Sequence, residues 1–409
     1  MSATLGELAA ATAAAEAYRA DIRRFLDAEL GPDWPGVGSL SPEEYEAFRT
    51  RWRTTLALRG HLAPAWPARY GGGGRGHLES VVQAEELARR GAPRGGPNDP
   101  FSIQMIGNTL LALGTEEQKE RFLPGILDGT YRFCQGFSEP GHGSDLRAVE
   151  TRARREGDSW IVDGQKIWTS NATTANWCFV LCRTAGPETD RSRALTLLLV
   201  PLEQPGVEIR PIRMMSGTSE FCEVFYDGAV TAVGLEVGGE GGGWPAATRL
   251  LTFERGETTA TLPVRFQAEL DRLVALVRAR GADADPWVRQ ELAWCHERVQ
   301  LMTLNGRRNL ARWQRGEPIG AESSVEKLFW SEYHVRATAL ACAVLGDDGL
   351  VYEGSDPVSY FLADEPGASA LSSAAWLKVH FSALAETIAA GTSEIQRNVI
   401  AERLLGLPR

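Results

Sequence analysis

The sequence predicts a fold of the α+β class, with a helical first part, a central β domain and a helical last part. Apolar residues recur at helical spacing in the first part, short apolar runs separated by turns follow from about Tyr131, and helical spacing then returns. We therefore expect a helical domain over residues 1–130, a β domain over 131–240 and a helical bundle domain over 241–409.

The helical first part carries recognisable start signals. Residues 5–26 place apolar side chains on one face of a long opening helix. Ser41 with Glu44, and Thr115 with Gln118, have the spacing of a capping box, in which each side chain accepts a hydrogen bond from the backbone N–H of the other residue. These pairs predict two further helix starts.

The β domain is predicted from runs of β-branched and aromatic residues. Trp160–Val162 and Lys166–Trp168 flank Asp163-Gly164, a pair typical of a tight turn, so we expect a hairpin there. Further strands are expected at residues 177–182, 195–200, 207–212 and 222–226.

Two apolar stripes at helical spacing follow the β domain. Leu270, Leu273, Val274 and Val277 form the first, and Leu292, Cys295, Val299 and Met302 form the second. They predict long helices that pack face to face.

Composition excludes several classes of partner. A net charge of -10 and a hydrophobic fraction of 43% describe an acidic globular chain without a basic field for nucleic acid or an anionic membrane. No apolar run reaches the length of a membrane span, and no basic signal-peptide start precedes Arg19, so we expect a cytoplasmic protein.

The cysteines give no sign of a metal. Six are scattered along the chain without a CxxC pair or a histidine at ligand spacing, so they are expected to be small buried hydrophobic residues. Cys178 and Cys182 have the same parity along a strand and should share one face. We expect no metal.

The most informative segments are Phe137–Asp145 (FSEPGHGSD) and Lys166–Ala172 (KIWTSNA). Their glycines let the backbone approach a flat ligand, and their hydroxyls and tryptophan offer hydrogen bonds and a stacking surface. The residues alone also fit an ordinary glycine-rich turn beside a core tryptophan.

A resemblance to a family gives these segments a function. The first is similar to the TEPxAGSD motif of acyl-CoA dehydrogenases with Ser138 and His142 as variants, the second resembles their KxWITNA motif, and Gly391–Asn398 (GTSEIQRN) resembles their last motif. His142 stands where relatives have Ala, and we interpret it as a steric or polar variant.

The resemblance implies the acyl-CoA dehydrogenase fold, in which an N-terminal helical domain, a central β-barrel-like domain and a C-terminal four-helix bundle bind FAD. Matched positions imply that the cofactor is bound by Gln135, Phe137, Ser138, Gly143, Ser144, Trp168, Thr169, Ser170, Gly391, Thr392 and Glu394. Thr392 and Glu394 open the last helix, whose first amides suit electron-rich groups of FAD.

The catalytic base requires separate identification. Short- and medium-chain members carry a Glu directly before the Gly-Thr of the last motif, but this chain has Ala390 there. Isovaleryl and long-chain types place the Glu before an Arg on an earlier helix, which here corresponds to Glu254-Arg255. Glu254 is therefore the candidate base, although it also fits a structural partner of a nearby cation.

The substrate side of the predicted site includes Ser144, Arg255 and Ala390. Arg255 is expected near CoA or the base, or in a surface ion pair. The backbone N–H of Ala390 can donate to the thioester carbonyl without a Glu side chain.

In many homotetrameric relatives a second subunit contributes two FAD-binding motifs, which we call the FAD clasp. Neither motif is intact here. Gln267-Ala268 follow Arg265-Phe266 where an Arg-x-x-Phe-Gly motif is usual, and Gly346–Gly349 contains two acids beside the expected diphosphate. Two nearby anionic groups repel. The pattern resembles heteromeric bacterial members, so we expect a homo-oligomer or a heteromer with a sister subunit.

Together these features predict an FAD-dependent α,β-dehydrogenase of an acyl-CoA, or of an acyl group on a carrier protein, with an electron-transfer flavoprotein as acceptor. The alternatives are a flavin-dependent monooxygenase or oxidase on the same fold, and a non-catalytic partner subunit of a heteromeric dehydrogenase.

Overall fold

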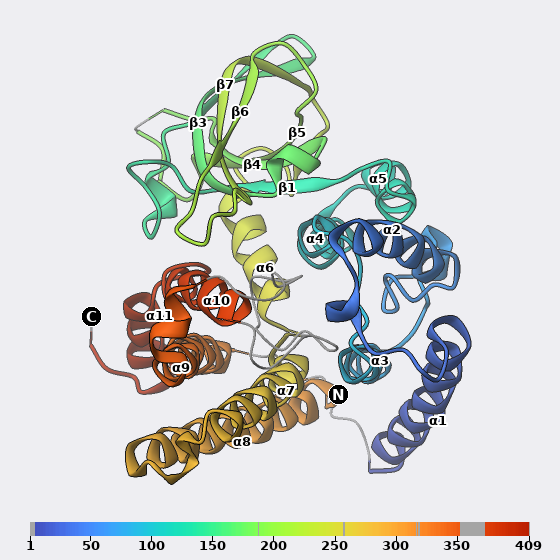
Figure 1. Cartoon of the computed structure of the whole chain (residues 1–409). Helices are drawn as coiled ribbons and strands as arrows, with labels where there is room; N and C mark the ends of the chain where they lie inside the picture. The colour runs from blue at the N-terminus through green and yellow to red at the C-terminus, as the bar shows by residue number, and fades with distance from the viewer. Residues whose placement is uncertain are drawn as a thin grey trace. The chain divides into compact units, whose positions relative to one another are not determined.

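The computed structural model describes residues 5–186, 188–256, 258–315, 317, 320–351 and 373–408, without the side chains of 5–9, 252–256, 258–260, 313–314 and 374. Its helices are α1 (Leu5–Leu30), α2 (Pro42–Leu58), α3 (His77–Arg89), α4 (Asn108–Leu113), α5 (Glu116–Asp128), α6 (Gly243–Gly256), α7 (Thr258–Ala279), α8 (Pro286–Gln314), α9 (Glu322–Leu345), α10 (Ser373–Glu386) and α11 (Ser393–Val399) (Figure 1). The strands are β1 (Phe133–Gly136), β2 (Arg152–Glu156), β3 (Ser159–Ser170), β4 (Trp177–Arg183), β5 (Leu195–Pro201), β6 (Val207–Ile212), β7 (Phe221–Ala232) and β8 (Glu236–Val237). Helices before and after a central set of strands confirm the predicted α+β order.

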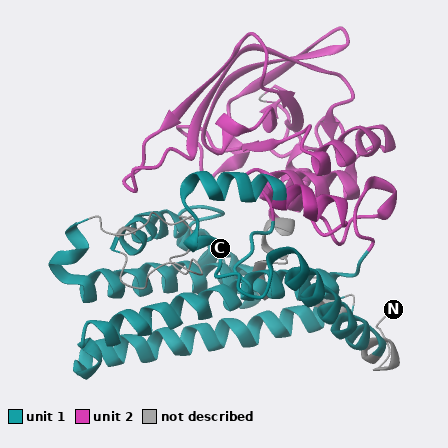
Figure 2. Cartoon of the chain, turned by 45° about the vertical axis from the view of Figure 1, so that its right-hand side comes forward, with its two compact units in different colours: residues 1–51, 75–94, 255–409 teal, residues 52–74, 95–254 magenta. Residues whose placement is uncertain are grey.

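The chain forms two compact units, each described by itself below. One contains residues 1–51, 75–94 and 255–409, and the other contains residues 52–74 and 95–254 (Figure 2). The boundaries predicted at residues 130 and 240 stay a prediction.

The second unit contains a sheet with the strand order β6-β7-β3-β2-β4-β5-β8, and β1 pairs with β4. The β1–β4 pair is parallel, and the long β4–β5 and β3–β7 pairs are antiparallel. All residues of β4 and β5 except the last of each are buried. Strands buried on both faces are typically continuous apolar runs, which explains why the sequence located them well.

The predicted hairpin at Asp163-Gly164 is wrong, because β3 runs unbroken from Ser159 to Ser170. The pairing with β7 instead shifts register between Val162 and Gly164. Gly164 has φ 149, and an added Cβ would lie 2.7 Å from the Cα of Thr151. This glycine therefore permits a bulge and a close backbone approach, not a chain reversal.

The cysteines of the β unit are buried, as expected. Cys134 and Cys178 are register partners on β1 and β4, and both belong to the same core cluster as Cys182 and Cys222. Burial raises the pKa of Cys182 to about 12. These cysteines therefore pack as small core residues.

In the first unit, α7, α8, α9 and α10 share one apolar core. Both predicted stripes contribute to it, with Leu273 and Val277 from α7 and Val299 and Met302 from α8 among the buried members. Phe266 is fully buried and packs edge-on against Tyr333 at a centroid distance of 5.0 Å. Burial of these stripes packs α7 and α10 into the same core.

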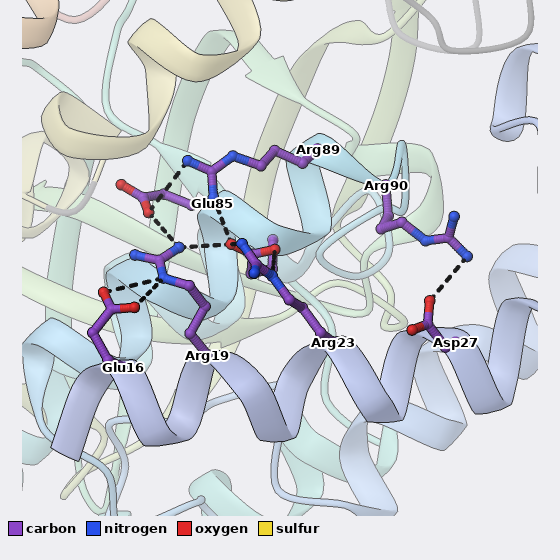
Figure 3. A network of polar contacts seen from close by, with 8 residues as sticks. Glu16, Arg19, Arg23, Asp27, Glu85, Arg89 and Arg90 are labelled. Carbon is purple, nitrogen blue, oxygen red and sulfur yellow. Dashed lines mark hydrogen bonds and ion pairs between the residues drawn. The ribbon is translucent and has the colours of Figure 1, made fainter. Parts of the chain in front are cut away.

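The α1 helix is joined to α3 by ion pairs (Figure 3). Glu86 of α3 is 3% exposed and accepts hydrogen bonds from Arg19 at 2.6 Å and from Arg23 at 2.8 Å. Arg19 also donates to Glu85. Burial alone would raise the pKa of Glu86, but the guanidinium groups lower it overall, so the carboxylate stays ionised.

Both predicted capping boxes are confirmed. Ser41 and Glu44 exchange hydrogen bonds of 2.8 and 3.3 Å at the start of α2. Thr115 and Gln118 exchange bonds of 3.1 and 3.2 Å before α5. Across the described part of the chain, none of the helices combines the length and apolar character of a bilayer span.

Candidate functional site

One group of predicted site residues meets in the β unit. Phe137 and Ser138 follow β1, and Trp168 and Ser170 lie at the end of β3. Ile167 N–H donates to the Ser138 carbonyl at 2.9 Å, so the segment after β1 lies directly beside the end of β3. Two motifs separated in the sequence thus form one surface.

Trp168 is the prominent side chain of this surface. It has φ 60 and is 55% exposed, with an edge-on contact to Phe221 at 6.1 Å. The ladder between β3 and β7 shifts register between Lys166 and Thr169, which lets the indole leave the alternating pattern. An exposed indole in a left-handed conformation is unusual and indicates a binding surface.

The neighbours of Trp168 differ in how far their side chains are buried. Ser138, Ser170 and Gln135 are half-buried, whereas the Phe137 and Thr169 side chains are buried. Of the two hydroxyl residues after Trp168, Ser170 is therefore the accessible one, whereas Thr169 is fully buried.

Gly143 and Ser144 lie in an exposed turn of the same unit. Glu139 and His142 exchange two backbone hydrogen bonds of 3.0 Å, which close the turn immediately before them. An added Cβ at Gly143 would meet nothing within 4 Å. The space beside this glycine is therefore open, and its predicted contact with a ligand stays a prediction.

A second group of site residues belongs to the unit that contains the bundle. Ala390 and Gly391 have φ 53 and φ 90, and Gln396 Nε2 donates to both of their carbonyls at 3.1 Å. Thr392 Oγ1 accepts from Ile395 N–H at 3.2 Å and so caps α11. The turn before α11 is therefore stabilised by Thr392 and Gln396, which belong to the same motif.

Glu394 is exposed in the first turn of α11 and contacts Arg397 at 3.4 Å. Its own backbone N–H and the Thr392 hydroxyl lower the pKa of its carboxyl. This carboxylate is therefore ionised at neutral pH.

Glu254 and Arg255 lie in the last turn of α6. Their side chains are outside the described residues. Also outside them is Tyr352–Ser355, whose sequence (YEGS) resembles the Glu-Gly-Thr pattern but lies well before the last helix, so we do not expect it to be catalytic. The assignment of Glu254 as base and of Arg255 as a substrate contact stays a prediction.

The acidic turn after α9 has a partner within the chain. Asp348 forms an ion pair with Arg280, which follows α7. Its charge is thus partly neutralised, and the repulsion of a diphosphate expected from the sequence is smaller on the Asp348 side.

The residues of the β unit fit a flat heteroaromatic cofactor such as the flavin of FAD. Trp168 supplies an exposed aromatic face, Ser138 and Ser170 supply accessible hydroxyls, and Gly143 leaves the backbone open. Such a donor set suits a planar ring with polar edges.

The sequence analysis missed the residues that hold these surfaces in place. Lys166 Nζ is fully buried and donates to the Phe137 carbonyl at 3.0 Å and to Glu139 at 2.8 Å. Gln396 plays the equivalent role for the Ala390 turn. Both lie inside the recognised motifs. Their polar side chains, which are long enough to reach neighbouring backbone carbonyls, were the signal that could have identified them.

Comparisons with known proteins find similarity over nearly the whole chain. The N-terminal, middle and C-terminal domains of acyl-CoA dehydrogenase match residues 12–130, 134–229 and 241–405. Acyl-CoA dehydrogenase IpdE1 of Mycobacterium tuberculosis is 41% identical over 404 residues, which cover 96% of this chain and 98% of that protein.

Two solved structures are similar along the full length. The Tcur3481-Tcur3483 steroid ACAD has a TM-score of 0.78 and 32% identity, and the alignment covers 97% of this chain and 98% of that one. The ChsE4-ChsE5 complex from Mycobacterium tuberculosis has a TM-score of 0.74 and 30% identity, with coverage of 100% and 99%. The chain therefore belongs to the acyl-CoA dehydrogenase family of FAD-dependent oxidoreductases.

Proposed function

We propose that this chain catalyses the α,β-dehydrogenation of a bulky acyl-CoA thioester, with an acyl group of the steroid class as the first candidate. The observation that carries the proposal is the surface formed by Ser138, Trp168 and Ser170, which fits a flavin ring. The substrate class rests on the similar structure named a steroid ACAD, at 32% identity.

Each group of site residues has a role in this proposal. Ser138, Trp168 and Ser170 hold the flavin ring, Gln135 and Phe137 border it, and the backbone of Gly143 and Ser144 contributes at its edge. Thr169 is fully buried and sets the position of Trp168 and Ser170 from within β3. Thr392 and Glu394 shape the turn around Gly391 on the cofactor side. When bound, FAD accepts the hydride that leaves the β carbon.

Glu254 removes the α proton in the proposed mechanism. A water-poor acyl pocket raises the pKa of a carboxylate by desolvation, which brings it closer to that of the thioester α carbon. The Ala390 N–H donates to the thioester carbonyl oxygen and stabilises the negative charge that develops there. Arg255 contacts CoA or orients the Glu254 carboxylate.

The proposed partners are an electron-transfer flavoprotein and a sister subunit. The second-subunit FAD motifs are altered at Gln267-Ala268 and at Asp347-Asp348, and a similar solved structure is a complex of two different chains, ChsE4 and ChsE5. A sister subunit that supplies an intact clasp would explain both features. A homo-oligomer is the alternative assembly.

The test is anaerobic flavin bleaching by a panel of straight-chain, branched and steroid acyl-CoA thioesters. Glu254→Gln should reduce the bleaching rate by about 10²–10⁴-fold, because it removes general-base catalysis. Glu240→Gln, an exposed carboxylate shortly before α6, is the matched control and should bleach at the native rate. Equal rates for Glu254→Gln and the native chain would refute the base assignment.

Two other outcomes would replace the proposal. Rapid reoxidation by air with a hydroxylated product would identify a monooxygenase or oxidase, in which a base at position 390 matters less. A colourless chain that is inactive alone and stabilises a sister subunit would identify a non-catalytic partner, a role that Ala390 at the usual base position favours.

A further inference from the structure

Three helices of the bundle each place an ionisable side chain in a contact closed to solvent. His334 of α9 is fully buried, with its Nδ1 2.7 Å from Oε2 of Glu386 and its Nε2 3.1 Å from Oε2 of Glu269. Glu269 lies on α7 and is 1% exposed, and Glu386 ends α10 and is 8% exposed. One imidazole thus bridges two carboxylates from different helices.

The geometry defines the charge of this group. When both carboxylates are ionised they only accept hydrogen bonds, so both nitrogens of His334 donate and the ring is an imidazolium. Burial alone would lower the pKa of His334, but the two carboxylates raise it to about 10. Lys327, also buried, donates from Nζ to the Glu386 carbonyl at 2.8 Å. Burial raises the pKa of the Glu386 carboxyl, whereas the positive charges of His334 and Lys327 oppose that rise.

The cluster lies at the start of the turn that bears Ala390. Glu386 is the last residue of α10, and the turn at residues 387–391 follows it directly. Lys327 contacts the Glu386 backbone, and Ser393 N–H donates to the Thr387 carbonyl at 2.9 Å. The first part of the turn is therefore fixed by the cluster, as Gln396 fixes its last part.

Ala390 makes external support for this turn necessary. A residue with a Cβ is strained in the left-handed region, and it persists there only when its surroundings over-determine the backbone. Ala390 has φ 53 and no catalytic carboxylate of its own, so its proposed role depends on where its N–H points.

We propose that Glu269, His334, Glu386 and Lys327 form a positioning network that holds the turn at residues 387–391 in the shape that aims the Ala390 N–H at the thioester carbonyl. The inference about the carbonyl rests on the function proposed above, whereas the inference about the turn does not. His334 touches no substrate and acts through Glu386.

The test is hydrogen exchange, resolved by peptide, on the purified full-length chain. In His334→Leu the amides of residues 387–391 should exchange at least about tenfold faster, while those of α8 change by less than about twofold. Glu386→Gln should give a smaller increase, because its amide oxygen still accepts from His334. Glu291→Gln breaks an ion pair with Arg336 between α8 and α9 and is the matched control, with no change at 387–391.

A second readout separates positioning from binding. If the turn is misplaced, flavin reduction by the best thioester of the panel should slow about 10- to 100-fold in His334→Leu, with the flavin absorption spectrum unchanged. Glu291→Gln should reduce flavin at the native rate.

The outcomes separate the two proposals. A uniform rise in exchange throughout the bundle would overturn the network, because a general loss of stability would then explain the effect. A local rise in a chain that no thioester bleaches supports the network and counts against the proposed function. If His334→Leu does not fold, Glu386→Gln carries the test, and unchanged exchange at 387–391 would overturn the inference.

Discussion

The side-chain nitrogen of Lys166 lies 2.8 Å from Oε1 of Glu139 inside the β unit, where Lys166 is fully buried. The same carboxylate accepts from the backbone N–H groups of Glu150 at 2.6 Å and Thr151 at 2.8 Å. One ion pair therefore fixes β3, the segment after β1 and the chain that enters β2. The surface that contains Ser138 and Trp168 is built on this buried contact.

Removing the lysine should destabilise the chain strongly. Lys166→Met leaves the Glu139 carboxylate buried without its cation, and we expect unfolding free energy to fall by about 3–5 kcal/mol. Arg154→Met removes exposed pairs with Glu156 and Asp163 and should cost below about 1 kcal/mol. Urea unfolding followed by fluorescence measures both. Similar urea midpoints for the two variants would contradict the large stabilising effect expected of the buried Lys166.

Trp168→Ala should separate cofactor binding from stability. The indole is 55% exposed, so its loss should change unfolding free energy by less than about 1 kcal/mol. If it stacks on flavin, FAD affinity should fall at least about tenfold in a fluorescence titration. Trp287→Ala, at 53% exposure near the start of α8, is the control. FAD affinity equal to that of the control would remove Trp168 from the site.

Stability should fall as pH rises, because of His334. Its pKa is about 10 in the folded chain and about 6.5 when unfolded, so the folded chain holds the extra proton between these values. The stabilisation is fully present below pH ~6.5 and is lost as pH rises through about 10, at up to about 1.4 kcal/mol per pH unit. Urea midpoints at pH 7, 8 and 9 should fall more steeply for the native chain than for His334→Gln. If the urea midpoints of the native chain and of His334→Gln fell equally with pH, the result would argue against a buried imidazolium.

Glu326→Gln should stabilise the chain at alkaline pH. Glu326 is 4% exposed, and burial raises its pKa to about 8, with Arg308 opposing the shift. The folded chain thus takes up a proton relative to the unfolded chain between pH ~4.5 and 8, and the ionised form costs stability above that window. We expect a gain of roughly 1–3 kcal/mol at pH 8 and little change at pH 5. Glu297→Gln, exposed on α8, should show no such difference, and an equal gain at both pH values would contradict the prediction.

Local features of the sequence were sufficient for most of the elements. The capping boxes at Ser41 and Thr115 depend on residues three positions apart, and both were predicted correctly. The fully apolar runs of β4 and β5 were predicted within one residue, because a strand buried on both faces carries its signal in its own composition. The hairpin at Gly164 was wrong because the close approach that requires this glycine comes from Thr151 on a neighbouring segment.

The candidate site divides in the same way. The sequence by itself determined the family, through three ordered motifs, and it predicted which residues face the cofactor and substrate. Only the tertiary structure decided which charged residues hold those motifs in place, since His334 is 52 positions from Glu386 and 65 from Glu269. The physical reason is that a buried ion pair is specified by helix and strand packing, which brings distant residues together and excludes water from them, and no local pattern encodes that exclusion.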